Sequence, residues 1–316
     1  MIKKELLCKC AMILLIILSS PGHLLADTPV SGFITSDRTW TTVDSPYIVT
    51  GDVYVLQGVT LTIEPGVVVK FDSGFSLQID GELISKGTAD KLITFTSSEA
   101  SPAPGDWNFI LFTQFSTDAV VDNDNNYVSG SALEHCLIEY GGGMGPKGYP
   151  KAKCGVIRVE DSSPFIGSCI IENNDCSGVE ITGSAAPTIT QNIIEKNISA
   201  RYGGGIFLDT IGSAKILSNK INNNSVTSGG GGLYITGESI LVSNNQISDN
   251  ITEGYGGGIV VSFSGEITNP ILIDKNFITA NSGTGGGGGI YSDGSSSKGV
   301  LITNNYVTNN NGGTHI

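Results

Sequence analysis

The second half of the chain repeats one pattern of apolar and polar positions, Ile-x-x-Asn-x-Ile-x-x-Asn. The apolar positions keep a strict register, and successive copies begin 23 to 33 residues apart. This spacing is typical of one coil of a solenoid. The seven copies begin at Leu133, Ile166, Ile189, Ile216, Val242, Ile273 and Ile302.

The polar positions of the repeat form two columns. Identical amides at a fixed repeat position indicate stacking, because each buried amide can hydrogen-bond to the copies above and below it. Cys136 and Cys169 begin the first column, and Gly141 and Asn174 begin the second. The expected ladder continues with Asn192, Asn219, Asn245, Asn276 and Asn305 in the first column and Asn197, Asn224, Asn250, Asn281 and Asn310 in the second.

Short runs of alternating apolar and polar residues fill most of the remaining chain. Between Tyr47 and Phe95 these runs are separated by Gly, Asp or Pro, which is typical of short strands, and no stretch has a persuasive helical period. A third strand follows each amide pair in the later repeats. In four coils a glycine run introduces this strand, and we interpret the run as a structural turn.

The pattern also divides the chain. Residues 1–26 resemble a secretory signal, with lysines before a short apolar run and Ala26 at the expected cleavage site. Residues 27–46 are interpreted as a lead-in segment and N-terminal cap, and residues 47–316 as the solenoid, with lengthened loops near 99–130 and 141–153. The chain stops at Ile316 midway through a coil, which predicts a missing C-terminal region or a partner at that end.

Charge and hydropathy limit the possible partners and the cellular location of the protein. The net charge is −13 for the whole chain and −15 without residues 1–26. Nucleic-acid binding requires clustered Lys and Arg, so we expect no nucleic-acid partner. No apolar run of the mature chain is long enough to span a bilayer. We therefore expect a secreted protein at the cell exterior or cell surface, with the periplasm as an alternative.

Several segments resemble a known group. Residues 40–52, 61–71, 81–83 and 93–97, including Leu61-Thr-Ile-Glu-Pro-Gly-Val-Val-Val-Lys-Phe71, are similar to the opening of exported bacterial right-handed parallel β-helix proteins of the pectate-lyase-like superfamily. The later Asn and Gly-Gly-Gly-Ile repeats are similar to polymorphic outer-membrane adhesins. The resemblance implies an all-β, right-handed parallel β-helix (solenoid). We expect about ten or eleven coils and a length of roughly 50 Å at about 4.8 Å per coil.

The cysteines test this alignment of coils. Cys154 and Cys176 each stand three residues before an inward position of the third strand, so the coils place them one above the other. Neighbouring parallel strands lie within the range that a disulfide requires, and we predict a Cys154–Cys176 bond. For Cys136 and Cys169 a buried pair of thiols is favoured over a bridge.

The middle residue of the third strand forms an outward column: Arg158, Glu180, Phe207, Tyr234, Val260 and Tyr291. Exposed aromatic rings beside carboxylates and hydroxyls suit the flat face of a sugar ring, so this column is a candidate carbohydrate site. Alternatively, aromatic and β-branched residues occur there because they favour strand surfaces.

A basic loop precedes this column and contains Lys147, Tyr149, Lys151 and Lys153. It could bind a uronate or sulfate group, or it could be an ordinary solvated loop. A polysaccharide lyase would use Arg158 or Lys153 as the base in β-elimination, usually with calcium.

Calcium has one weak candidate site of its own, at Asp122, Asp124 and Asn126, where oxygen ligands alternate as in a calcium loop. Tyr127 and Leu133 replace the Gly and Glu that such a loop requires. We therefore expect no cofactor, with calcium as the alternative.

Two functions are compatible with these features. The favoured one is a non-catalytic, adhesin-like scaffold that binds an extracellular polysaccharide or another cell-surface component. The alternative is a calcium-dependent polysaccharide lyase that acts on uronic-acid-containing glycans.

Overall fold

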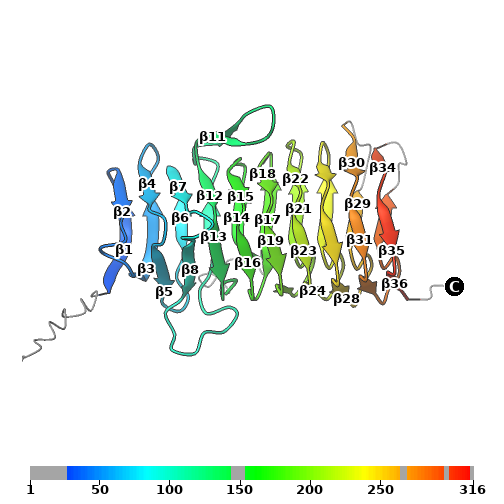
Figure 1. The fold of residues 1–316 in the computed structure, drawn as a ribbon, viewed down its shortest axis with the longest axis horizontal. Helices are drawn as coiled ribbons and strands as arrows, with labels where there is room; N and C mark the ends of the chain where they lie inside the picture. Colours follow the sequence, from blue (N-terminus) through cyan, green and yellow to red (C-terminus); the bar gives the residue numbers. More distant parts are fainter. Residues whose placement is uncertain (1–26, 144–153, 264–268, 295–298, 314–316) are drawn as a thin grey trace, which may run out of the picture.

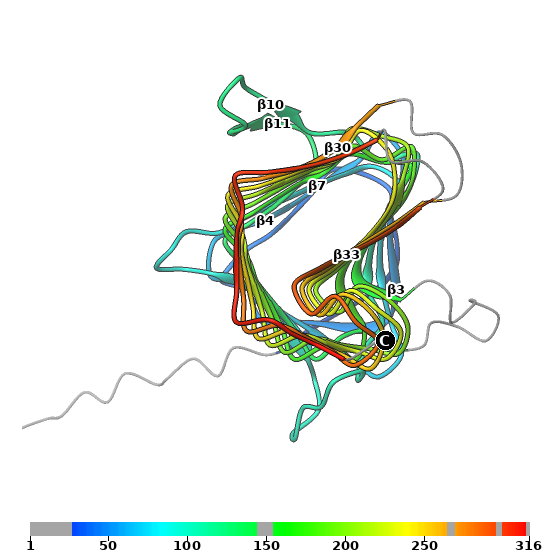
Figure 2. The same cartoon turned by 90° about the vertical axis from the view of Figure 1, so that its right-hand side faces the viewer.

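The computed structural model describes residues 27–143, 154–263, 269–294 and 299–313. It confirms an all-β, right-handed parallel β-helix whose coils lie side by side along one axis (Figure 1). Viewed along that axis, the coils superimpose around a common interior (Figure 2). The described residues contain no helical segment that could span a bilayer.

Each coil contributes strands to three long faces, named here in the order in which the chain visits them. Face 1 is a ten-stranded parallel sheet, which agrees with the expected number of coils. Its strands are β2 (Arg38–Trp40), β4 (Thr60–Ile63), β7 (Glu82–Lys86), β12 (Ala132–Glu134), β15 (Phe165–Gly167), β18 (Thr188–Thr190), β22 (Lys215–Leu217), β26 (Leu241–Ser243), β30 (Ile271–Asp274) and β34 (Val300–Thr303).

Faces 2 and 3 belong to one continuous sheet, because the long strand β3 (Tyr47–Val55) pairs with both β5 and β6, and β1 (Thr28–Ile34) pairs with β3. Face 2 contains β5 (Val68–Phe71), β8 (Ile93–Ser97), β13 (Cys136–Glu139), β16 (Ile170–Glu172), β19 (Ile193–Glu195), β23 (Lys220–Asn222), β27 (Gln246–Ser248), β31 (Phe277–Thr279) and β35 (Tyr306–Thr308). Face 3 contains β6 (Leu77–Ile79), β9 (Ile110–Phe112), β14 (Gly155–Glu160), β17 (Ser177–Gly183), β21 (Ile206–Thr210), β25 (Leu233–Gly237), β29 (Ile259–Phe263) and β33 (Ile290–Gly294).

A short fourth sheet occurs between faces 2 and 3 in the later coils. It contains β20 (Ile198–Ser199), β24 (Ser225–Val226), β28 (Ile251–Thr252), β32 (Ser282–Gly283) and β36 (Asn311–Gly312). The glycine runs that follow it stack backbone to backbone; for example, Gly203 N donates to Gly229 O at 3.1 Å and Gly230 N donates to Tyr255 O at 3.0 Å. The glycine runs are therefore structural turns, as predicted.

The two amide ladders are present and buried. Asn245 illustrates the pattern: its Nδ2 donates to Ile216 O at 2.8 Å and to Asn276 Oδ1 at 2.9 Å, while its Oδ1 accepts from the backbone N and Nδ2 of Asn219. Cys169 N donates to Asn192 Oδ1 at the start of the first ladder, and Gly141 N donates to Asn174 Oδ1 at the start of the second. An amide inside a ladder thus joins three successive coils.

An antiparallel hairpin leaves the coils within residues 99–130. It consists of β10 (Val120–Val121) and β11 (Tyr127–Ser129) and projects beyond face 1 (Figure 2). The segment predicted as a lengthened loop also contains β9, which pairs with β6 and β14 as an ordinary rung of face 3. Likewise, β1 and β2 lie in the predicted lead-in segment and pair with the first coils.

Candidate functional site

The outward column of face 3 is in register but is not exposed along its whole length. Parallel pairing stacks Arg158, Glu180, Phe207, Tyr234, Val260 and Tyr291 in successive coils, as expected. Arg158 is only 2% exposed, Glu180 3% and Val260 3%. The expectation that this column faces solvent is therefore wrong at these three positions, and the partly exposed members are aromatic.

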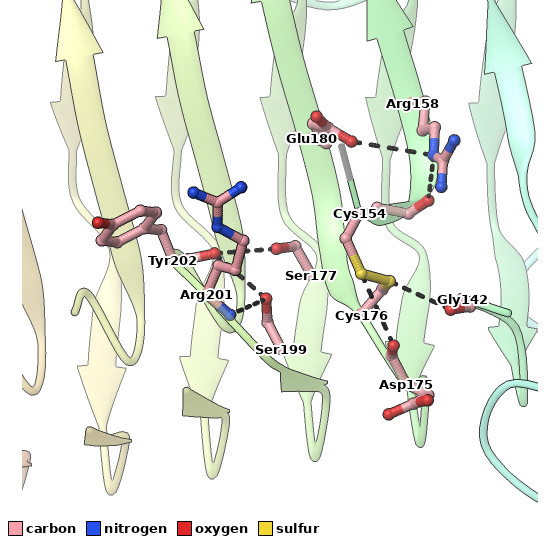
Figure 3. Close-up of a disulfide and its surroundings, with 11 residues drawn as sticks. Gly142, Cys154, Arg158, Asp175, Cys176, Ser177, Glu180, Ser199, Arg201 and Tyr202 are labelled. Carbon is pink, nitrogen blue, oxygen red and sulfur yellow. Dashed lines mark hydrogen bonds and ion pairs between the residues drawn. A yellow bond between two sulfur atoms is a disulfide. The ribbon is translucent and has the colours of Figure 1, made fainter. Parts of the chain in front are cut away.

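Arg158 is covered by a residue from the 99–130 segment. Its guanidinium carbon lies 3.9 Å from the centre of the Phe109 ring, and its Nε donates to Gly155 O at 3.1 Å. Glu180 on the next coil faces it, with Nε and Oε2 3.9 Å apart (Figure 3). This buried ion pair neutralises both charges inside the protein, which favours a structural role.

The predicted disulfide joins Cys154 to Cys176 on adjacent coils, with their Cα atoms 5.3 Å apart (Figure 3). Cys154 directly follows the predicted basic loop. Lys147, Tyr149, Lys151 and Lys153 lie outside the described residues, so their role stays a prediction.

The remaining described cysteines, Cys136 and Cys169, are free and buried. Cys169 Sγ donates to Leu133 O at 3.4 Å, and Cys136 Sγ lies 3.3 Å from Ser85 Oγ. Burial, followed by the neighbouring Cys136, raises the pKa of the Cys169 thiol well above its usual value. The pair is therefore the buried thiol stack that was favoured, and the Cys169 thiol is a poor nucleophile.

The weak calcium candidate lies in the turn of the β10–β11 hairpin. The Asp122 carboxylate accepts hydrogen bonds from the backbone N of Asp124, the backbone N of Asn126 and Asn126 Nδ2 at 2.8–3.1 Å. These bonds lower the pKa of Asp122 and commit both oxygens to the turn. No group of three His, Cys, Asp or Glu side chains suited to a metal occurs in the described parts of the chain. Calcium binding stays a prediction.

A groove of about 250 Å³ lies over the last four coils of face 3. Its lining combines four tyrosines with small polar side chains and one carboxylate, and the buried side chain of Val260 contributes to it. The lining residues are Tyr202, Ser228, Gly229, Tyr234, Tyr255, Val260, Ser262, Tyr291 and Asp293.

The four tyrosines form two pairs that bridge adjacent coils. Tyr202 and Tyr234 have ring centres 4.5 Å apart and a 40° interplanar angle, and Tyr255 and Tyr291 are also 4.5 Å apart, at 27°. Tyr234 stacks further on Phe207 at 5.7 Å. These contacts hold the rings in place before any ligand binds, which reduces the entropy lost on binding.

The pairs arise from an alternation of Tyr and Gly in the turn before each face 3 strand. Parallel bridges align Tyr202, Gly229, Tyr255 and Gly286 on four successive coils. A Cβ placed on Gly229 would lie 3.5 Å from Val260 Cγ2 and 3.9 Å from Tyr234 Cε2. A longer side chain there would therefore crowd the groove that Gly229 lines.

Negative charge lies at one end of the groove. Desolvation, followed by the charge of Asp293 and by Tyr255, raises the pKa of the Tyr291 hydroxyl. A tyrosine hydroxyl is protonated at neutral pH, so Tyr291 can donate a hydrogen bond, while Asp293 can accept one. The site can bind hydroxylated, ring-shaped ligands through stacking and hydrogen bonds.

Of the residues that line the groove, the sequence predicted Tyr234 and Tyr291 but missed Tyr202, Tyr255, Ser228 and Asp293. Phe207 was also predicted; it stacks on Tyr234 but lines a neighbouring small depression instead of the groove. A signal was present, because Tyr immediately precedes the glycine runs that begin at Gly203 and Gly256. Its meaning depends on the direction of the rings, which the sequence alone does not show.

Comparisons with known proteins agree with this architecture. The family model described as "Right handed beta helix region" matches residues 117–296, and the "Pectate-lyase like beta helix domain" model matches residues 32–144. Protein bark beetle of Drosophila melanogaster is 42% identical over 66 residues, which is 21% of this chain and 2% of that protein.

Two solved structures can also be aligned over most of the chain. The periplasmic alginate epimerase AlgG is 12% identical with a TM-score of 0.36, over 89% of this chain and 85% of that one. The hyper-glycosylated fragment of TibA is 14% identical with a TM-score of 0.17, over 91% of this chain and 94% of that one. At this level of similarity neither structure bears on activity.

Proposed function

The chain belongs to the right-handed β-helix family, and on this premise we propose that it is a non-catalytic carbohydrate-binding protein of the cell exterior. The groove formed by Tyr202, Tyr234, Tyr255 and Tyr291 is the binding site. The observation that carries the proposal is the arrangement of these rings in two packed pairs beside hydroxyl and carboxylate groups.

The chemistry of the groove suits a sugar. The C–H face of a pyranose packs against an aromatic ring, and its hydroxyls require donors and acceptors at the edge. Ser228, Ser262 and Asp293 supply such groups around the tyrosines. The groove lies on a lateral face of the solenoid, so a chain of several sugars can continue beyond it along the coils.

The burial of Arg158 favours binding over β-elimination. A lyase base must contact the carbon beside the uronate carboxylate, whereas Arg158 is 2% exposed and lies under Phe109. The lyase alternative would then rest on Lys153, which lies outside the described residues.

An exterior location is supported by the Cys154–Cys176 disulfide, because such bonds persist in oxidising compartments. The proposed partner is accordingly an extracellular polysaccharide or a glycan on a cell surface. We call this role adhesin-like because the protein would bind a surface glycan without altering it. The groove lies on a lateral face of the solenoid, so binding requires no conformational change.

The test is a glycan array probed with the purified mature chain, followed by calorimetric titration of the glycans that bind. We expect binding without turnover, and about tenfold weaker affinity for Tyr234→Ala and for Tyr255→Ala, because each removes one ring of a packed pair. Phe277→Ala is the matched control: Phe277 is 42% exposed and stacks on Tyr306, but it lies on face 2.

Two results would overturn the proposal. One is unchanged affinity in both tyrosine variants, which would place the site elsewhere. The other is release of unsaturated products from a uronic-acid polymer, read as ultraviolet absorbance, which would replace binding by lyase activity.

A further inference from the structure

The groove is anionic as well as aromatic. Asp293 is exposed at its rim, and none of the described residues that line the groove is Lys, Arg or His. Arg201, the residue before Tyr202, does not line the groove but an adjoining small depression with Cys154 and Glu180. Tyr202 lines both, and the Arg201 guanidinium carbon is 5.8 Å from its ring centre (Figure 3).

Tyrosine rings add to this negative character. The face of an aromatic ring carries negative charge density, so several rings around one space attract a cation placed between them. The two tyrosine pairs together span four successive coils. The buried Val260 of β29 lies between Tyr234 of β25 and Tyr291 of β33. Asp293 is on β33 as well, two residues after Tyr291. An ammonium group in the groove would lie among these rings and on the same face of the solenoid as the Asp293 carboxylate.

The whole chain reinforces this preference. Its net charge is −13, so the long-range field repels uronate and sulfate polymers and attracts cationic ones. The raised pKa of the Tyr291 hydroxyl, caused by desolvation and then by Asp293, is consistent with a carboxylate close enough to act on the groove.

We propose that the groove prefers glycans bearing a free ammonium group, that is, polymers or oligomers of unacetylated amino sugars. This inference rests on the proposed carbohydrate-binding function and names its ligand class. A neutral N-acetylated sugar would use the same stacking contacts but would gain nothing from Asp293 or from the ring faces as cation acceptors. A uronate would be repelled by Asp293.

The experiment compares three oligosaccharides of equal length on the intact mature protein: a glucosamine oligomer, its N-acetylated form and a uronic-acid oligomer. The glucosamine oligomer should bind about tenfold more tightly than the acetylated one, and the uronic-acid oligomer most weakly. Added salt should reduce this preference, because Asp293 is exposed and its attraction is screened.

Asp293→Asn isolates the charge without removing a ring. It should weaken binding of the glucosamine oligomer roughly two- to fivefold and leave the acetylated oligomer unchanged. Asp209→Asn is the matched control. Asp209 is also an exposed carboxylate on a face 3 strand, β21, where it pairs with Thr236, but it does not line the groove. It should change neither affinity.

The possible results separate this inference from the proposed function. Equal binding of the acetylated and free-amine oligomers would overturn the ammonium preference while leaving carbohydrate binding intact. Equal binding of an oligolysine of matched charge would overturn the saccharide specificity. Absence of binding to all three oligosaccharides would count against both proposals.

Discussion

The two halves of the solenoid fill the interior of the same coil geometry with different residues. From β1 to β9 the interior packs large aromatic side chains among Val, Leu and Ile; the fully buried aromatic residues include Trp40, Phe71, Phe95, Trp107 and Phe112. From β15 onward the inward positions of the three faces are mostly Ile, Leu and Val, and two amide ladders line the corners. A shared coil geometry therefore does not require a shared interior.

The difference between the two interiors is related to the corners, that is, the turns at which a coil passes from one face to the next. In the second half, each ladder position or its equivalent follows a non-glycine residue with φ between 50° and 62°, as in Lys196 before Asn197 and Ala280 before Asn281. Left-handed backbone costs roughly 1–2 kcal/mol for such residues. The ladder offsets this cost, because the amide oxygen one coil onward accepts the backbone N–H that follows the corner. In the first half, up to Gly130, left-handed positions are glycine except for Asn125.

The largest expected effect lies in the aromatic half. Trp107 stacks on Phe71 with ring centres 4.3 Å apart and donates from Nε1 to Glu139 O at 2.8 Å. Trp107→Ala should lower the free energy of unfolding by about 3–5 kcal/mol through the cavity and the lost bond. Urea denaturation followed by fluorescence of the remaining tryptophan measures this. The exposed Phe115→Ala should change little, and a similar small loss for Trp107 would mean that the aromatic interior is not what stabilises these coils.

A ladder amide should come next in size. Asn245→Ala removes the acceptor of two Asn219 groups and the donor to Ile216 O and Asn276 Oδ1, all buried. We expect a loss of about 2–4 kcal/mol in unfolding free energy, since several polar groups are left unpaired. Asn222→Ala is the control, because Asn222 is also buried but belongs to neither ladder, and its Nδ2 donates to Glu195 Oε2. Equal losses in the two variants would contradict a special role for the ladder.

The smallest effect should have the opposite sign. Ala280 is an exposed corner residue with φ 55°, so Ala280→Gly relieves left-handed strain without losing packing. A gain of about 0.5–1 kcal/mol in unfolding free energy is expected from thermal or urea denaturation. Ala132→Gly, at a buried strand position with ordinary backbone, should instead lose about 1 kcal/mol. A loss in both would show that the corner carries no strain.

Much of the fold was predictable because it depends on contacts between residues at equivalent positions of adjacent coils. The repeat spacing placed Cys154 over Cys176 and aligned the amides, and the structure pairs them as expected. The surface proposed to bind carbohydrate was only partly predictable. Phe109 arrives from the 99–130 segment and covers Arg158, a contact that the register of the repeat does not contain.

The sequence by itself determined the solenoid, its number of coils, the ladders and which residues share a column, because these follow from a periodic pattern in which each coil contacts its neighbours. Only the tertiary structure decided which members of a column reach solvent and how Tyr202 and Tyr255 lean over the adjoining coils. Those outcomes depend on side-chain directions and on excursions that cross between coils, and neither is periodic along the chain.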